Sequence, residues 1–154
     1  GEMISDVTFE KTTYAELPHK FEAGTPNISG AIAFGYALDY INKIGLDNIY
    51  NYENELLNYA TQSLKKIEGL KIYGDTNNKT SVISFNIENL HPYDIGSILD
   101  KFGIAVRTGQ HCAQPIMDHF LISGTVRVSL SFINTKKEID KLIEAINIAK
   151  TMLS

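Results

Sequence analysis

The stretch TVRVSLSFINTKKEID, from Thr125 to Asp140, combines the two periodicities that decide the fold of this 154-residue chain. Apolar and polar residues alternate through its first half, which is typical of a strand with one buried face. Thr135 and Glu138 then form the spacing of a capping box, which marks the start of a helix. The sequence therefore predicts a strand followed by an amphipathic C-terminal helix. The buried stripe expected for that helix is Ile139, Leu142, Ile143, Ile146 and Leu153.

The same two patterns recur upstream of this stretch. Strands are predicted at 70–74, 81–87 and 104–107, and a helix is predicted at 92–102. The residues expected to be buried in the second strand are Ile83, Phe85 and Ile87. Those expected on the buried face of the helix are Ile95, Ile98, Leu99 and Phe102. This order of elements predicts an α+β fold, with an antiparallel or mixed sheet and helices packed on one face.

The N-terminal third has a different character. Residues 1–17 predict one or two short extended segments, and His19–Asn27 reads as a loop because glycine and proline interrupt it. Ile28–Ile44 is apolar on most sides, which predicts a buried helix capped by Asn27 or Ser29.

A second helix is expected from a cap at Asp47 to about Glu68. The buried stripe expected for it is Ile49, Leu56, Ala60, Leu64 and Ile67.

Composition limits the classes of function. The net charge of −4 gives no basic excess that would favour nucleic acid or an anionic membrane. A single cysteine excludes an internal disulfide and is typical of a reducing, cytoplasmic protein. No apolar run reaches the length of a membrane span, and the first residues lack the features of a signal peptide. Because the chain begins with Gly1, we consider both a processed terminus and a piece of a longer polypeptide.

The only two arginines of the chain are expected on one face of the sheet. Ile104 and Val106 share a face of their strand, so Arg107 lies on the other face, and the same alternation places Arg127 opposite the apolar residues of its strand. A guanidinium group binds a carboxylate through two parallel hydrogen bonds. The pattern therefore favours a small carboxylate ligand, although an exposed ion pair explains Arg127 equally well.

The stretch RTGQHCAQP, from Arg107 to Pro115, holds the only cysteine. Its residues alone leave open whether Cys112 is a packing residue, a metal ligand or a reactive thiol. His111 and His119 are the other candidate ligands, but the spacing of a structural zinc site is absent, so no metal is expected. His111 is also compatible with a simple solvated loop residue.

RTGQHCAQP followed by TVRVSLSFINTKKEID resembles the C-terminal part of the pyridoxal-phosphate-dependent cysteine desulfurases, in the class V aminotransferase superfamily. The short loop between arginine and cysteine resembles the SufS-type, or group II, branch, which includes enzymes similar to selenocysteine lyase. The stretch FEAGTPNISGAIAFGYALDYI, from Phe21 to Ile41, resembles the family's segment where the large domain meets the small one. The opening GEMI resembles the approach to that segment.

The resemblance implies the small C-terminal domain of a fold-type I pyridoxal phosphate enzyme. Residues 1–27 would belong to the large cofactor-binding domain and its connection, and residues 28–154 would form the small α+β domain with the cysteine loop. The family's cofactor lysine would lie upstream of Gly1, so we expect the chain alone to be inactive. The full-length family implies a homodimer.

The resemblance also implies a role for each motif residue. Cys112 would attack the substrate sulfur and carry the persulfide, and Arg127 would bind the substrate carboxylate. Arg107 and His111 would support the cysteine loop and the substrate. Thr25 would reach the cofactor phosphate of the neighbouring subunit.

The activity implied is conversion of L-cysteine to L-alanine, with sulfur passed through Cys112 to an acceptor protein of the SufE/SufU type for iron–sulfur cluster assembly. One departure is Gln110, where many relatives carry a second histidine, and this puts a proton-transfer role at that position in doubt. Two alternatives stay open: a selenocysteine lyase or related lyase, and a stand-alone sulfur-carrier module that works without pyridoxal phosphate.

Overall fold

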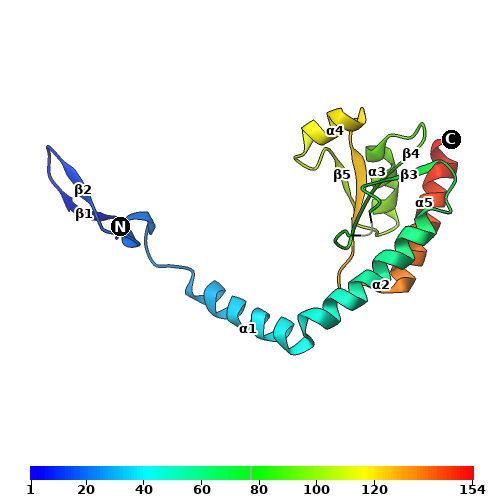
Figure 1. The fold of residues 1–154 in the computed structure, drawn as a ribbon. Coiled ribbons are helices and arrows are strands. Elements are labelled where there is room, and N and C mark those ends of the chain that lie inside the picture. The colour runs from blue at the N-terminus through cyan, green and yellow to red at the C-terminus, as the bar shows by residue number, and fades with distance from the viewer. Residues whose placement is uncertain (77) are drawn as a thin grey trace. The chain divides into compact units, whose positions relative to one another are not determined.

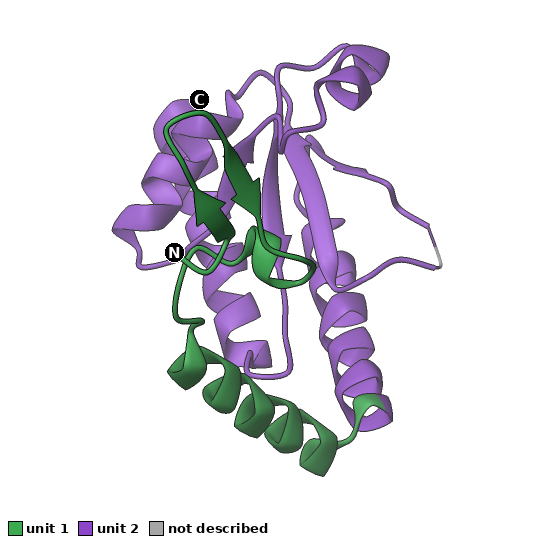
Figure 2. Ribbon diagram, turned by 90° about the vertical axis from the view of Figure 1, so that its left-hand side faces the viewer, with its two compact units in different colours: residues 1–46 green, residues 47–154 purple. Residues whose placement is uncertain are grey.

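The computed structural model describes residues 1–76 and 78–154. The helices and strands are labelled in Figure 1. The chain divides into two compact units, Gly1–Leu46 and Asp47–Ser154, which are coloured separately in Figure 2. Among the described residues, no helix has both the length and the apolar character needed to cross a membrane.

The first unit begins with a hairpin of β1 (Ile4–Val7) and β2 (Thr12–Tyr14), which pair antiparallel. This confirms the expected extended segments. The loop predicted at His19–Asn27 is wrong in part, because it contains one 3-10 turn, η1 (His19–Phe21). The amide of Glu22 donates to the carbonyl of His19 at 3.0 Å and closes this turn.

Helix α1 (Ile28–Ile44) starts and stops where the sequence predicts. The side chain of Asn27 accepts a hydrogen bond from the amide of Gly30 at 2.9 Å, which confirms this residue as the cap. The prediction of a buried helix is wrong, because no residue of α1 is buried. Burial needs apolar surface from other elements, and the unit itself supplies only a hairpin and one short turn.

The second unit is built on a four-stranded antiparallel sheet. Its order is β3 (Leu70–Tyr73), β4 (Val82–Ile87), β6 (Thr125–Ser129) and β5 (Arg107–Gly109). The α+β class and the antiparallel sheet are therefore confirmed. The predicted alternation in β4 is confirmed as well, since every second residue is buried, namely Ile83, Phe85 and Ile87.

Three helices cover the apolar face of this sheet: α2 (Leu46–Leu64), α3 (Pro92–Lys101) and α5 (Lys136–Leu153). Their buried side chains join those of β4 and β6 in one hydrophobic cluster. The helical members of this cluster include Leu56, Ala60, Leu64, Ile95, Leu99, Ile139, Leu142 and Ile146. The capping box at the start of α5 is confirmed, because Thr135 and Glu138 exchange both hydrogen bonds.

The predicted ends of α2 are wrong. The helix begins at Leu46, so Asp47 lies in its first turn instead of capping it. It ends at Leu64. The amide of Ile67 donates to the carbonyl of Leu64, three residues earlier, and this spacing is that of a 3-10 turn and not of an α-helix. Ile67 is nevertheless buried, as expected.

The predicted buried position of Phe102 at the end of α3 is also wrong, since its side chain is 50% exposed. Helix α3 ends at Lys101, and the chain then turns through Gly103 in the left-handed region with φ 72°. This turn rotates Phe102 away from the face that the helix buries.

The strand predicted at 104–107 is displaced to β5 (Arg107–Gly109), and the strand predicted from Thr125 to Phe132 ends at Ser129. Only residues 107–109 pair with β6, because the amide of Ile104 donates back to the carbonyl of Leu99 at 3.0 Å instead of joining the ladder. Ile104 and Val106 still pack against the core, so the predicted alternation holds. Helix α4 (Gln114–Phe120) connects β5 to β6.

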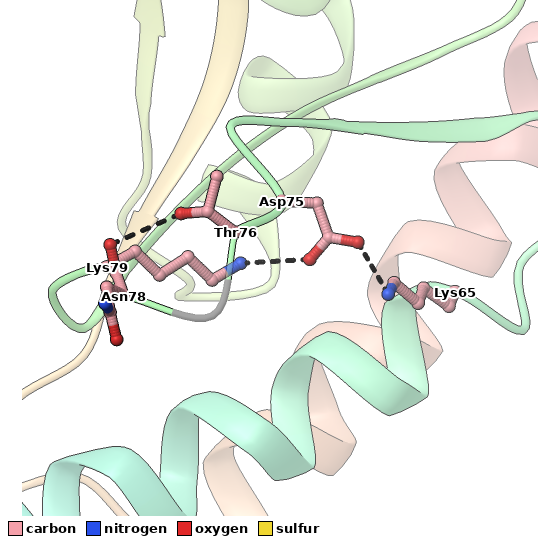
Figure 3. Close-up of polar contacts among 5 residues, drawn as sticks. All are labelled: Lys65, Asp75, Thr76, Asn78 and Lys79. Atoms are coloured by element: carbon pink, nitrogen blue, oxygen red, sulfur yellow. Dashed lines mark hydrogen bonds and ion pairs between the residues drawn. The ribbon is translucent and has the colours of Figure 1, made fainter.

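An ion-pair cluster ties the connection between β3 and β4 to the end of α2 (Figure 3). Asp75 accepts hydrogen bonds from the ammonium group of Lys65 at 2.6 Å and from that of Lys79 at 3.5 Å. The Lys65 ammonium is the main cause that lowers the pKa of the Asp75 carboxyl. In the same turn, the hydroxyl of Thr76 donates to the carbonyl of Asn78 at 3.3 Å.

Candidate active site

The arginines stand side by side on the face of the sheet opposite to the one that α2, α3 and α5 cover. Arg107 of β5 lies directly opposite Arg127 of β6, and cross-strand partners share a face. Arg127 in turn lies opposite Ser84 of β4, which lies opposite Tyr73 of β3. The predicted placement of both arginines is therefore confirmed. The sheet carries a transverse row of Tyr73, Ser84, Arg127 and Arg107, which we call the arginine row.

Cys112 lies in the connection from β5 to α4, three residues beyond the end of the strand. Its side chain is exposed, so the packing interpretation is wrong. The Nη2 atom of Arg107 donates to its sulfur atom at 3.6 Å. A guanidinium this close complements negative charge on sulfur, which is the form of a thiol that attacks electrophiles.

His111 points the other way, toward the start of β6. Its Nε2 atom lies 2.8 Å from the hydroxyl oxygen of Thr125, a residue that is only 1% exposed. Burial is the main cause that lowers the pKa of His111, and the positive charge of Arg127 lowers it further. Both effects favour the neutral form of the imidazole. A solvated loop residue does not describe it.

A hollow of about 280 Å³ adjoins Arg127 and His111. Its walls are mostly apolar and include three residues of α4, while its polar side chains belong to β3, β4, β6 and the loop that holds Cys112. The Nε atom of Arg127 and the Nδ1 atom of His111 are buried without a hydrogen-bond partner. The residues around the hollow are Tyr73, Gly74, Ser84, His111, Ala113, Ile116, Met117, Phe120, Ile122, Thr125 and Arg127.

The structure does not bring Cys112, His111 and His119 together as a metal site. In the described part of the chain, the one group of three metal-ligating side chains that converge is Glu2, His19 and Glu22. These three lie in the first unit, and His19 forms ion pairs with both carboxylates, at 4.0 and 3.4 Å.

The sequence profile of the aminotransferase class-V family matches residues 1–142. The chain belongs to the aminotransferase class-V family. Membership of this family confirms the class V aminotransferase superfamily that the sequence motifs indicated. The solved structure of a cysteine desulfurase supports the predicted fold type I of pyridoxal phosphate enzymes.

Named members of this class V family resemble the chain closely. A probable cysteine desulfurase of Xylella fastidiosa is 47% identical over 146 residues, which are 95% of this chain and 35% of that protein. A cysteine desulfurase of Synechococcus elongatus is 50% identical over 151 residues, which are 98% of this chain and 24% of that protein. The crystal structure of the cysteine desulfurase CsdA from Escherichia coli superposes with a TM-score of 0.84 and 32% identity. It is matched over 100% of this chain and 38% of that one.

The chain therefore spans well under half the length of these class V relatives. Two strands and one loop of the second unit bring together four of the predicted site residues, namely Cys112, Arg107, His111 and Arg127. Thr25 lies in the first unit, exposed between η1 and α1. The roles predicted for all five residues stay predictions.

Sequence reasoning missed Thr125, Ser84 and Tyr73. The signal was present for two of them, because the alternation that places Arg127 on the polar face places Thr125 there too. The same reasoning applies to Ser84 in its own strand. What the alternation cannot give is the pairing of strands, which brings Ser84 next to Arg127.

Pyridoxal phosphate, the cofactor that the class V resemblance implies, needs an amine to hold it as an imine. No lysine lines the hollow beside Arg127. Lys71 lies nearest along the sheet, but its ammonium group sits 5.2 Å from the centre of the Tyr73 ring. The groups at the arginine row therefore suit a substrate carboxylate and a sulfur atom, and they do not fit the attachment of the cofactor.

Proposed function

We propose that this chain is the C-terminal part of a cysteine desulfurase. In the complete protein, Cys112 would take sulfur from L-cysteine as a persulfide, and L-alanine would be released. The observation that carries the proposal is the exposed thiol of Cys112, 3.6 Å from a guanidinium of the arginine row. The identity of 47 to 50% with proteins named as desulfurases supports it.

Arg127 binds the substrate carboxylate in this proposal. A guanidinium pairs with a carboxylate through two parallel bonds and so fixes its orientation. Arg127 is rooted in a buried strand between β4 and β5, so its position varies little. Holding the carboxylate at the arginine row orients the substrate sulfur relative to Cys112.

The transfer step balances without an outside oxidant. The thiolate of Cys112 attacks the substrate sulfur, and a sulfur–sulfur bond forms while the carbon–sulfur bond breaks. The electron pair of the broken bond stays on the substrate carbon, which takes up a proton to become the methyl group of alanine. Arg107 complements the negative charge of the attacking sulfur. The lowered pKa of His111 favours its neutral form, so Arg107 and not His111 is assigned the positive charge beside the sulfur.

Pyridoxal 5′-phosphate is the proposed cofactor, and the lysine that attaches it is expected outside this chain. When bound, it supplies the electron sink that prepares the carbon–sulfur bond for cleavage. In a homodimer of the complete protein, Thr25 would bind the cofactor phosphate of the neighbouring subunit. Its exposed position before α1 is compatible with that role.

The persulfide would then pass to an acceptor protein of the SufE/SufU type, for iron–sulfur cluster assembly in the cytoplasm. An exposed thiol suits transfer to a second protein, because the acceptor must reach the outer sulfur atom. The loop of only four residues between Arg107 and Cys112 supports the SufS-type branch.

The decisive experiment uses the polypeptide that contains this chain with whatever the gene encodes upstream of Gly1. It is incubated with L-cysteine, pyridoxal phosphate and a reductant, and alanine and sulfide are followed. We expect Cys112→Ala to lower both by about a hundredfold or more. Arg127→Lys, which keeps the charge but loses the two-pronged geometry, should instead raise KM by about tenfold.

Other outcomes point elsewhere. Release of selenide from selenocysteine without turnover of cysteine would favour a selenocysteine lyase. No turnover of either substrate by a cofactor-loaded protein would contradict the proposal. The 154-residue chain alone should show no turnover of cysteine with added pyridoxal phosphate. Turnover by this chain alone would contradict the proposal that the lysine that attaches the cofactor lies outside it.

A further inference from the structure

The cysteine loop has a backbone that its own residues do not favour. His111 and Cys112 have φ angles of 56° and 57°, in the left-handed region where residues with a Cβ are uncommon. Two such residues in succession cost free energy, and the conformation persists only where surrounding contacts hold it. A contact outside the loop must therefore fix this turn.

That contact is the hydrogen bond between His111 and Thr125. Thr125 is 1% exposed and begins β6, and it pairs across the sheet with Gly109, the last residue of β5. The two strands approach closely at this point, because a Cβ on Gly124 would lie 2.7 Å from the carbonyl carbon of Gly109. Thr125 is thus a rigid point at the base of the cysteine loop.

The loop has a second tether, a turn in which the amide of Ala113 donates to the carbonyl of Gln110 at 2.9 Å. This bond is local and closes the turn, but it does not tie the loop to the sheet. The side chain of His111 ties the loop to β6, and the side chain of Arg107 ties it to β5 through the sulfur atom of Cys112. On the other side of the turn, Cys112 then lies with its sulfur atom at the guanidinium of Arg107.

We propose that Thr125 is a positioning residue for the sulfur chemistry of Cys112. Its hydroxyl, acting through His111, holds the loop so that the sulfur atom lies against the Arg107 guanidinium. This inference depends on the proposed function of Cys112, and it gives His111 the role of an anchor instead of a proton carrier. Thr125 acts on the sulfur atom through its hydrogen-bond partner His111.

The test compares Thr125→Val, which removes the hydroxyl at nearly constant volume, with Thr125→Ser, which keeps it. Three quantities are measured on the full polypeptide: kcat for cysteine, KM for cysteine, and the rate at which iodoacetamide alkylates Cys112. Alkylation needs no turnover and no cofactor, so it reports on the loop even if the desulfurase proposal fails. Thr61→Val is the matched control, because the hydroxyl of Thr61 is also buried but has no hydrogen-bond partner.

We expect Thr125→Val to lower kcat by about tenfold to a hundredfold, since misplacing a reactive group by about 1 Å has an effect of that size. KM should change less than about twofold, because Arg127 still binds the carboxylate. Alkylation should slow severalfold as the sulfur loses its guanidinium neighbour. Thr125→Ser and Thr61→Val should stay within about twofold of the wild type in all three quantities.

Three results would overturn the inference. The first is a Thr125→Val variant with the kcat and alkylation rate of the wild type. The second is a Thr125→Ser variant whose kcat falls as far as that of the valine variant, and the third is a rise in the KM of Thr125→Val with no change in kcat. If Thr125→Val does not fold, His111→Ala removes the same hydrogen bond from the loop side and should reproduce its expected effects. Where both fold, the double variant should be no worse than either single one, since both remove one contact. Additive losses would contradict the shared role.

Discussion

Helices α1 and α5 have nearly the same length and both begin at a side-chain cap, but only one of them builds a core. The 17-residue α1 is apolar on most sides and has no buried residue. The 18-residue α5 is apolar on one face and buries Ile139, Leu142, Ala145, Ile146 and Ala149. The contrast teaches that local signals decide where a helix forms, whereas its burial depends on the surfaces that other elements provide.

The largest expected effect on the free energy of unfolding comes from removing a buried phenylalanine of the second unit, compared with an exposed phenylalanine of the first. Phe85 is fully buried in β4, whereas Phe34 of α1 is 66% exposed. We expect Phe85→Ala to lower the free energy of unfolding of the second unit by about 3 to 5 kcal/mol, because it opens a cavity in the sheet-facing core. Phe34→Ala should change it by less than about 0.5 kcal/mol. Urea denaturation followed by circular dichroism measures both, and equal losses would remove the contrast between the units.

A smaller effect is expected at the two helix caps. Thr135→Ala breaks the capping box of α5 and should destabilise the second unit by about 1 kcal/mol, because α5 packs on its core. Asn27→Ala removes the cap of α1 and should only increase fraying of that helix. Amide hydrogen exchange separates the two outcomes. If Asn27→Ala lowered protection in β4, α1 would be coupled to the core after all.

The smallest expected effect lies in the ion-pair cluster of Asp75, within the second unit (Figure 3). The pKa of the Asp75 carboxyl is lowered in the folded protein from its ordinary value of 3.8, chiefly by Lys65. The ion pairs of Asp75 therefore stabilise the fold fully at a pH above this ordinary pKa. Their stabilisation is lost as the pH falls through the lowered pKa of the folded protein. Asp75→Asn should shift the urea midpoint slightly at pH 7, and not at all in strong acid.

Salt provides a check on this last prediction. The main partner, Lys65, is 55% exposed and Asp75 is 37% exposed, so the shift caused by Asp75→Asn should shrink at about 1 M salt, where charges are screened. Asp118→Asn, at an exposed position of α4, serves as the control and should have no effect at either pH. A shift that persists in strong acid would mean that Asp75 acts by geometry and not by charge.

The sequence predicted most of the second unit, because its signals are local. Alternation located the buried residues of β4, and the spacing of Thr135 and Glu138 located the start of α5. Alternation also placed Arg107 and Arg127 on one face before the pairing of their strands was known. The sequence could not give the length of β5, because a strand ends where its partner stops accepting hydrogen bonds.

The candidate site was predicted less completely than the fold. The arginines and Cys112 stand out because of their chemistry, but Thr125 looks like an ordinary strand residue. Its partner His111 is 14 positions away, and only the left-handed turn of the loop brings the two side chains together. Interactions that depend on such a turn leave no periodic trace in the sequence.

The pairing of Arg107 directly with Arg127 has a thermodynamic consequence. Like charges at opposite positions of neighbouring strands repel, and β5 is an edge strand of only three residues, which pairs within the sheet with β6 and not with another strand. Under the proposed function, a bound substrate carboxylate would screen that repulsion, so substrate binding and the docking of β5 would favour each other. The affinity for the carboxylate would then include the removal of this repulsion, and β5 would be held more firmly in the occupied sheet than in the empty one.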